Sequence, residues 1–253
     1  MGVRLNSPHN ELALINYSTY LLNMLTGAPH RQFKDRLYGQ LSRVGKALAS
    51  AHRLELLELL AQGERTVDSL ASETSMSVAS TSQHLQALRE GGLVESRKQG
   101  LFVHYRLADP AVFELTRALR VVAEARLAEL ERIVRDHFGD RSEPEPVMMA
   151  ELVERARSGS VTIIDTRPAS EYAAGHIAGA ISVPIDELQE QLKRLPKGKE
   201  YVAYCRGPYC AYADRAVEVL RANGRRARRL ADGFPEWKAS GLPIEAQLGA
   251  SPS

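Results

Sequence analysis

Residues 54–107, LELLELLAQGERTVDSLASETSMSVASTSQHLQALREGGLVESRKQGLFVHYRL, decide the fold of the first half of the chain. Apolar residues recur there at helical spacing, and Gly63 and Gly91-Gly92 interrupt the pattern. The spacing predicts three helices, over residues 52–62, 66–72 and 78–90, and a turn at 75–77 between the last two.

A β-hairpin is predicted next, because two strand-like runs, residues 93–97 and 103–107, flank Gly100. Longer amphipathic helices are predicted on either side, over residues 33–50 and 111–138. This order is that of a winged helix-turn-helix, whose second helix enters the DNA major groove and whose hairpin, the wing, lies along the backbone. The first half is therefore predicted to be a mainly α-helical winged helix-turn-helix domain.

The helix over residues 78–90 has a face suited to reading bases. At about 100° per residue, the face that should pack inward consists of Val78, Thr81, Leu85 and Leu88. The candidate DNA contacts on this helix and on the wing are Ser77, Ser80, Gln83, His84, Gln86, Arg89, Arg97 and Lys98. Glutamine can pair with adenine through two hydrogen bonds. For the helix by itself, a merely solvated polar face is the alternative interpretation.

The net charge of the whole chain is only +2, so overall charge does not select a nucleic-acid partner. Acidic and basic residues also nearly cancel in each half. The local positive charge available to phosphates comes from Arg89, Arg97, Lys98 and Arg106. Glu90 and Glu95 offset part of it. We therefore expect the affinity for double-stranded DNA to come from a dimer.

The second half changes in character after the polar, proline-containing segment GDRSEPEP, residues 139–146. Strand-like apolar runs alternate with helical stretches, which predicts an α/β domain. A buried-strand pattern at 200–204 leads directly into Cys205-Arg206-Gly207-Pro208-Tyr209-Cys210, and a helix is predicted over 211–220. Backbone N–H groups and the helix dipole at such a position favour a thiolate anion.

The chain has two cysteines, Cys205 and Cys210, and both lie in this one segment. In a cytosolic protein, such closely spaced cysteines suggest redox, sulfur or metal chemistry. Two unrelated buried thiols are the alternative. No apolar run approaches the roughly 18 residues needed to span a bilayer, and no signal-peptide pattern is present. We therefore expect a cytoplasmic protein with no membrane partner.

The first half resembles the ArsR-type winged-helix repressors over residues 33–138, and SQHLQALREGGLV, residues 82–94, is the strongest local match. The resemblance implies a homodimer in which helices 33–50 and 111–138 pair. Many relatives place metal-ligand cysteines before the turn, but the corresponding TVDSLA contains none. His104, Asp109 and His137 do not form a convincing soft-metal site. We therefore expect no metal or cofactor here and look for the sensor elsewhere.

The second half closely resembles the rhodanese family of sulfurtransferases over residues 148–245. The matching pieces are Asp165-Thr166-Arg167, EYAAGHIAGA at 171–180, Pro184, the loop that begins at Cys205, and DGFPEWKASGLPIE at 232–245. The resemblance implies a central parallel sheet and a nucleophilic Cys205 that carries a persulfide. The N–H groups of the loop that begins at Arg206 would cradle it. Asp165 and Arg167 would be supporting residues with a structural role.

Two residues of this loop narrow the chemistry. Related folds with a Cys-x5-Arg loop act on phosphate or arsenate, but the position six beyond Cys205 is Ala211, so the bidentate arginine is absent. Cys210 places a second thiol near a persulfide on Cys205, which puts efficient thiosulfate turnover in doubt. A thiol that attacks a persulfide can form a disulfide or polysulfide link. A direct bridge needs Cα atoms within about 7 Å.

Four functions are compatible with these features. The first is a repressor that senses sulfane sulfur or redox species, and the second is a sulfurtransferase with an uncoupled DNA-binding domain. The others are a docking module without chemistry and a metal or arsenite sensor, which two thiols leave short of ligands. The predicted division is an extension expected to be partly disordered (1–32), a DNA-binding and dimerisation domain (33–138), a linker (139–147), a rhodanese-like domain (148–247) and a tail (248–253).

Overall fold

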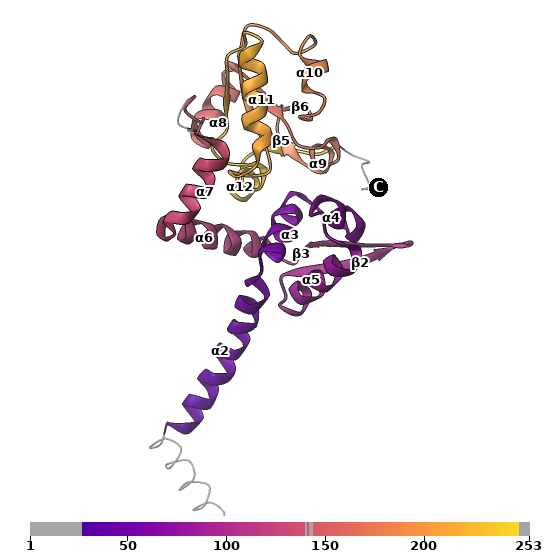
Figure 1. The fold of residues 1–253 in the computed structure, drawn as a ribbon, viewed down its shortest axis with the longest axis vertical. Coiled ribbons are helices and arrows are strands. Elements are labelled where there is room, and N and C mark those ends of the chain that lie inside the picture. The colour runs from indigo at the N-terminus through magenta and orange to yellow at the C-terminus, as the bar shows by residue number, and fades with distance from the viewer. Residues whose placement is uncertain (1–26, 140, 142–143, 248–253) are drawn as a thin grey trace, which may run out of the picture. The chain divides into compact units, whose positions relative to one another are not determined.

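The structure is a computed structural model that describes residues 27–139, 141 and 144–247 (Figure 1). The predicted tail and most of the predicted extension lie outside the described residues. The chain forms two compact units, Met1–Ala49 and Ser50–Ser253. In the first, helix α2 (Ala28–Leu48) begins five residues before the predicted helix. Its exposed apolar side chains are Phe33, Leu37, Tyr38 and Leu41.

The second unit begins with a winged helix-turn-helix, as predicted. Its elements are α3 (Ala51–Gln62), β1 (Arg65–Thr66), α4 (Val67–Glu73), α5 (Val78–Glu90), β2 (Val94–Gln99) and β3 (Phe102–Leu107). The three strands form an antiparallel sheet in the order β1-β3-β2. Gly100 has a φ of 61°, the left-handed backbone that a tight hairpin turn requires. The wing is therefore the hairpin β2–β3.

The α5 helix presents the two faces that the sequence predicts, with one exception. Thr81, Leu85 and Leu88 are fully buried, whereas Gln83 and Gln86 are exposed. The Ser77 hydroxyl accepts a hydrogen bond from the Ser80 N–H and caps the helix. The prediction that Val78 packs inward is wrong, because Val78 is the first residue of the helix and is 48% exposed.

The prediction of one long helix over residues 111–138 is also wrong. Helix α6 (Pro110–Arg126) ends at Leu127, whose backbone is extended, and helix α7 (Ala128–Phe138) begins directly after it. No Gly or Pro marks the break. The large apolar side chains that these helices leave exposed are Leu115, Leu119, Val121, Val122, Leu127 and Ile133. Both helices thus have apolar surface available to a partner.

The second half of the unit is an α/β domain around a four-stranded parallel sheet, in the order β6-β4-β7-β8. Its strands are β4 (Val161–Asp165), β6 (Ile181–Ser182), β7 (Glu200–Tyr204) and β8 (Ala227–Arg229). Its helices are α8 (Met149–Arg157), α9 (Ala169–Ala174), α10 (Leu188–Gln191), α11 (Ala211–Ala222) and α12 (Phe234–Ala239). A small antiparallel pair is formed by β5 (His176–Ile177) and β9 (Ile244–Glu245).

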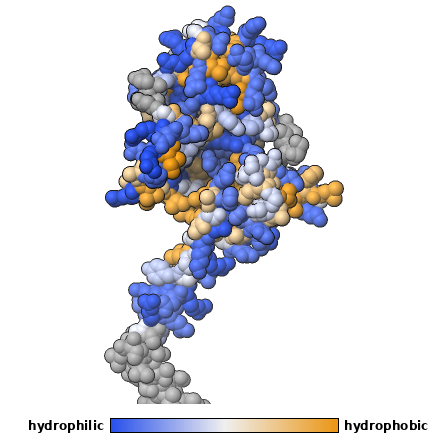
Figure 2. Space-filling view, in the orientation of Figure 1, coloured by the Kyte–Doolittle hydropathy of each residue, from blue (hydrophilic) through white to orange (hydrophobic). Residues whose placement is uncertain are grey.

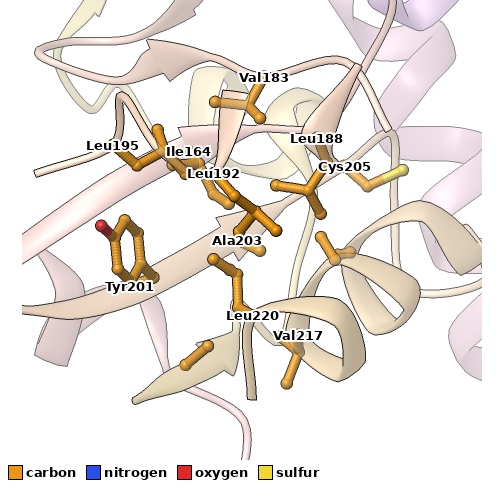
Figure 3. Packing of buried hydrophobic residues seen from close by; sticks show 13 residues of the cluster. Ile164, Val183, Leu188, Leu192, Leu195, Tyr201, Ala203, Cys205, Val217 and Leu220 are labelled. Atoms are coloured by element: carbon orange, nitrogen blue, oxygen red, sulfur yellow. The ribbon is translucent and has the colours of Figure 1, made fainter. Parts of the chain in front are cut away.

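Two apolar clusters cover the two faces of this sheet. Residues of α10 and α11 pack on one face, and residues of α8 and α12 pack on the other. Cys205 belongs to the first cluster, together with Ala203 and Val217 (Figure 3). A parallel sheet buried on both faces brings the carboxyl end of β7 into the protein interior, where the cysteine loop begins. None of the described helices is long and apolar enough to cross a membrane.

Candidate functional site

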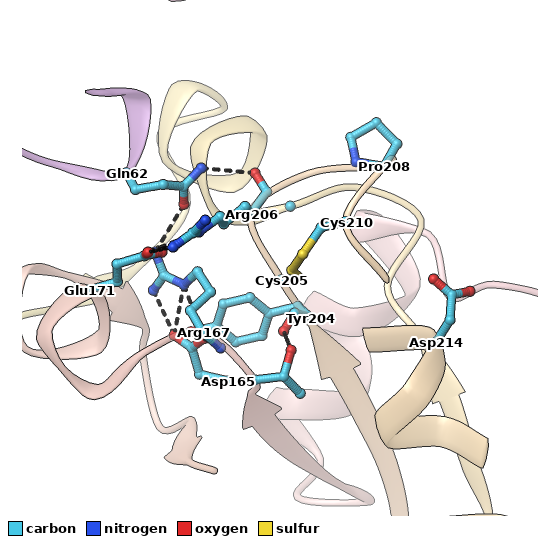
Figure 4. Close-up of a disulfide and its surroundings, with 12 residues drawn as sticks. Gln62, Asp165, Arg167, Glu171, Tyr204, Cys205, Arg206, Pro208, Cys210 and Asp214 are labelled. Carbon is cyan, nitrogen blue, oxygen red and sulfur yellow. Dashed lines mark hydrogen bonds and ion pairs between the residues drawn. A yellow bond between two sulfur atoms is a disulfide. The ribbon is translucent and has the colours of Figure 1, made fainter. Parts of the chain in front are cut away.

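Cys205 and Cys210 form a disulfide (Figure 4). Cys205 directly follows the central strand β7, and Cys210 is the N-cap of α11. Their Cα atoms lie 6.2 Å apart, within the limit that a direct bridge requires. Cys205 is only 2% exposed, whereas Cys210 is partly buried. We refer to residues 205–210 as the cysteine loop.

Asp165 and Arg167 form a fully buried ion pair beneath the cysteine loop. The Arg167 Nη2 donates to Asp165 Oδ2 at 2.6 Å and to the Gly175 carbonyl at 2.7 Å. The Tyr204 hydroxyl donates to the same Asp165 oxygen at 2.5 Å, and burial raises the pKa of Tyr204 well above its usual range. With every charge paired inside the protein, this arrangement suits support of the loop rather than contact with a substrate.

Arg206, the second residue of the cysteine loop, belongs to a cluster of four charged side chains, which we call the charge cluster: Arg65, Glu73, Glu171 and Arg206. Glu171 is 3% exposed and binds both guanidinium groups. Glu73 binds them as well, at 2.5 Å to Arg65 and 2.5 Å to Arg206. Burial opposes the charge of Arg206, but the hydrogen bonds that Arg206 donates to Glu171 and Glu73, and the charges of these two carboxylates, outweigh it and raise the pKa of Arg206. The cluster joins α4 of the winged helix to the cysteine loop.

Three more contacts join the cysteine loop to the preceding parts of the unit. Gln62, the last residue of α3, donates to the Arg206 carbonyl at 3.0 Å. Arg141, in the predicted linker, donates to the Pro208 carbonyl at 2.7 Å and pairs with Asp214. The Tyr209 hydroxyl donates to Glu124 of α6 at 2.5 Å. The sequence interpretation named none of Gln62, Arg141 and Glu124 as a site residue.

A cavity of about 420 Å³ lies between the cysteine loop, α3, α6 and the start of α12. Its walls are mostly apolar, and Glu58 is among the charged residues that line it. Glu58 is exposed to the cavity, but the protein around its carboxyl displaces water and raises its pKa, and the charge of Arg206 opposes the rise. A small molecule in this cavity would contact both the cysteine loop and the helix that precedes the helix-turn-helix.

The predicted DNA contacts lie on exposed parts of α5 and the wing, with several already in internal contacts. Gln83 and Lys98 are exposed. Gln86 donates to Glu90, and Arg89 to the Ser96 hydroxyl. Arg97 donates hydrogen bonds to Glu64 and Gln99. The His84 ring lies against the His52 ring, with the ring centroids 5.4 Å apart. Gln83 and Lys98 are therefore the clearest candidates for base and phosphate contacts.

The tip of the wing is apolar as well as basic. Leu101 is 95% exposed and Phe102 is 55% exposed. In the space-filling view, this projecting hairpin carries orange, hydrophobic surface at its end (Figure 2). The sequence interpretation considered only the charges of the wing. The apolar tip gives the hairpin a second kind of contact surface.

This geometry defines a class of protein: a winged helix-turn-helix bonded to an α/β domain that carries two cysteines at the end of its central strand. Residues 50–96 match the family of bacterial regulatory proteins called arsR, and residues 148–240 match the rhodanese-like domain. The HTH-type transcriptional regulator Rv0324 of Mycobacterium tuberculosis is 46% identical over 212 residues, which cover 84% of this chain and 93% of that protein. The chain therefore belongs to the ArsR family of transcriptional regulators and carries a rhodanese-like domain.

Other relatives match one half each. A sulfurtransferase of Allochromatium vinosum is 31% identical over 94 residues, 37% of this chain and 87% of the relative. The homodimeric winged helix-turn-helix DNA-binding domain of Mb0332 from Mycobacterium bovis, solved by NMR, is 48% identical and covers 37% of this chain and 87% of that chain, with a TM-score of 0.36. The two family matches and the relative that covers both halves confirm the predicted ArsR-type and rhodanese-like resemblances.

Proposed function

We propose that this regulator is a repressor that binds a DNA operator as a homodimer and senses sulfane sulfur or redox species through Cys205 and Cys210. In this proposal, α5 reads bases and the wing contacts the backbone. The exposed apolar faces of α2 and α6 support dimerisation, because large apolar side chains at helical spacing need a partner. The proposal places the protein in the cytoplasm, with residues 33–138 binding DNA and residues 148–247 sensing.

The sensing chemistry needs a donor such as an organic persulfide, R–S–SH. The Cys205 thiolate attacks the outer sulfur of the donor, which gives a Cys205 persulfide and releases R–S⁻. The Cys210 thiolate then attacks the inner sulfur of that persulfide, forming the Cys205–Cys210 disulfide and releasing HS⁻. The two cysteines are oxidised and the sulfane sulfur is reduced to sulfide. No other oxidant is required.

One observation carries this proposal: the only two cysteines of the chain form a disulfide on a loop that is bonded to the DNA-binding half. A docking module would have no use for paired thiols on that loop. An uncoupled enzyme would not need a charged side chain of α4, Glu73, to hold the residue next to its nucleophile.

The test is a DNA titration of reduced and persulfide-treated protein against one operator, with Cys205→Ser and Cys210→Ser treated identically. We expect the treated wild type to bind about 5- to 150-fold more weakly than the reduced protein. Both serine variants should keep the reduced-state affinity after treatment, because neither can close the disulfide. Equal affinities of treated and reduced wild type would contradict the sensing proposal.

Sulfurtransferase activity is the second candidate, because the rhodanese-like half resembles a protein named as a sulfurtransferase. Catalytic transfer predicts repeated turnover, in which a Cys205 persulfide passes its sulfur to an external thiol. Formation of the Cys205–Cys210 disulfide would compete with that step. An enzyme should therefore turn over faster as Cys210→Ser than as wild type, whereas a sensor should stop after one disulfide per protomer.

A further inference from the structure

Gln62 contacts the segment after Cys205 directly, and it reaches the segment before Cys205 through Arg167 and Asp165. It is 3% exposed, and its amide uses both ends: Nε2 donates to the Arg206 carbonyl at 3.0 Å, and Oε1 accepts from Arg167 Nη1 at 3.2 Å (Figure 4). Arg206 follows Cys205 directly. Arg167 is paired with Asp165, which holds the hydroxyl of Tyr204, the residue before Cys205. Gln62, a side chain of the winged helix-turn-helix, therefore helps to hold the cysteine loop in place.

The same side chain ends the helix that leads into the helix-turn-helix. Gln62 is the last residue of α3, and only Gly63 and Glu64 separate it from Arg65 in the charge cluster. A shift of the Arg206 carbonyl would move the end of α3 through Gln62. A shift of the Arg206 guanidinium would act on α4 through Glu73. Two adjacent groups of one loop residue thus contact two consecutive helices of the DNA-binding half.

We propose that Gln62 is a positioning residue that links the thiol–disulfide state of Cys205 and Cys210 to the packing of α3. The inference rests on the proposed function for its biological role, but its physical content is independent of DNA. The Gln62 contacts exist in the disulfide form, and the proposal is that they weaken in the dithiol, so that they stabilise the disulfide relative to the dithiol. Linkage is reciprocal: if the disulfide favours these contacts, the contacts favour the disulfide by the same free energy.

The relevant reaction with dithiothreitol is balanced. The reagent's two thiols reduce the Cys205–Cys210 disulfide to two thiols, and the reagent becomes a cyclic disulfide. Two electrons and two protons pass to the protein. The equilibrium constant of this exchange measures how strongly the surrounding structure favours the bridge.

The test compares two variants with a matched control. Gln62→Met keeps the volume and removes the hydrogen bonds to Arg206 and Arg167, together with a longer one of 3.4 Å to the Glu58 carbonyl within α3. Gln62→Glu keeps an acceptor for Arg167 but places an oxygen against the Arg206 carbonyl. Gln191→Met makes the same substitution in α10, where the amide donates only to Glu187. Each protein is equilibrated in dithiothreitol buffers, alkylated and measured by mass spectrometry.

We expect Gln62→Met and Gln62→Glu to shift the equilibrium toward the dithiol by about 3- to 10-fold, since a hydrogen bond contributes on the order of a tenfold preference or less. A tenfold shift equals about 30 mV for this two-electron couple. Gln191→Met should match the wild type. A wild-type equilibrium in both Gln62 variants would overturn the inference.

A second measurement applies if the variants fail to fold. Hydrogen exchange of the wild type should show faster exchange at the end of α3 in the dithiol than in the disulfide form, while α10 exchanges equally. Unchanged exchange at α3 would overturn the inference. The proposed function fails separately, when reduced and disulfide wild type bind the operator equally even though the Gln62 variants shift the equilibrium.

Discussion

The backbones of Gly233 and Gly207 lie so close together that there is no room for a side chain on Gly233. A Cβ atom on Gly233 would lie 2.4 Å from the backbone nitrogen of Gly207 and 2.5 Å from the carbonyl carbon of Arg206. Gly233 is the N-cap of α12, and its N–H donates to Glu236. The start of α12 therefore packs directly against the backbone of the cysteine loop.

Replacing Gly233 by alanine should displace the cysteine loop, because the contact is with backbone atoms that cannot rotate away. We expect Gly233→Ala to lower the free energy of unfolding by about 1–3 kcal/mol, as overpacking does. It should also speed reduction of the disulfide. Gly39→Ala in α2 is the control, since its Cβ would meet no atom within 4 Å. Urea unfolding curves that coincide for Gly233→Ala and wild type would refute this role.

The charge cluster should depend strongly on Glu171. Removing this carboxylate leaves Arg65 and Arg206 with less compensation in a largely buried site. We expect Glu171→Gln to cost about 3–5 kcal/mol of stability at most, the range for breaking a buried pair. Glu129→Gln, whose partner Arg132 is exposed, should cost no more than about 1 kcal/mol. Denaturant midpoints at constant slope would measure both, and equal losses would contradict burial as the cause.

Two substitutions separate base reading from phosphate contact. Gln83→Ala should relax discrimination between operator and mutated operator by about 1–3 kcal/mol. Lys98→Ala should weaken binding to all duplexes alike and flatten the dependence of affinity on salt. A gel-shift series at several salt concentrations measures both. If Gln83→Ala weakens all sequences equally, α5 does not read bases through this residue.

An external thiol should attack Cys210 rather than Cys205. In the disulfide form Cys205 is almost completely buried, whereas Cys210 is partly exposed, so attack on the bridge joins the reagent to Cys210 and releases the Cys205 thiolate. A bulky thiol added in limiting amount should therefore be found by peptide mass spectrometry on Cys210. The same reagent mainly on Cys205 would show that the loop opens before it reacts.

The pH dependence of stability should reveal Glu58. Its pKa in the folded protein is raised from the ordinary value of 4.5 by burial, so the folded state holds the proton more tightly than the unfolded state. Stability is therefore lost as pH rises from about 4.5 through the folded-state pKa. Glu58→Gln should lack this loss and be slightly more stable at neutral pH, by less than about 1 kcal/mol because solvent in the cavity screens the charge. Thermal unfolding across pH 4–8 would test it.

The sequence predicts local elements well because their signals are local. Periodicity, the glycine pair after α5 and the glycine in the wing turn place the helix-turn-helix and the hairpin within a few residues. The end of α6 at Leu127 has no such signal, and the exposure of Val78 depends on what surrounds the first turn of α5. Both depend on tertiary packing that a periodic pattern does not contain.

The sequence predicts the cysteines of the candidate site but not the residues of the winged helix-turn-helix and of α9 that contact the cysteine loop. Cys205 and Cys210 follow from the motif and its chemistry, and Asp165 and Arg167 follow from the rhodanese resemblance as supporting residues, without the ion pair between them. Gln62 lies 144 residues before Arg206, and Glu171 lies 106 residues after Arg65, so no spacing rule connects them. One signal was available: Gln62 is polar at a position three residues after Leu59, where the apolar stripe of α3 would continue.

The two cysteines are separated by only five positions in sequence, and this spacing has a thermodynamic consequence. A cross-link that closes so small a ring restricts the unfolded chain little, about 2 kcal/mol by the loop-entropy relation, compared with nearly 5 for a ring of 100 residues. Opening the ring therefore leaves most of the folding free energy intact. The bond can be made and broken many times in the life of one molecule without the domain ever passing through an unfolded form.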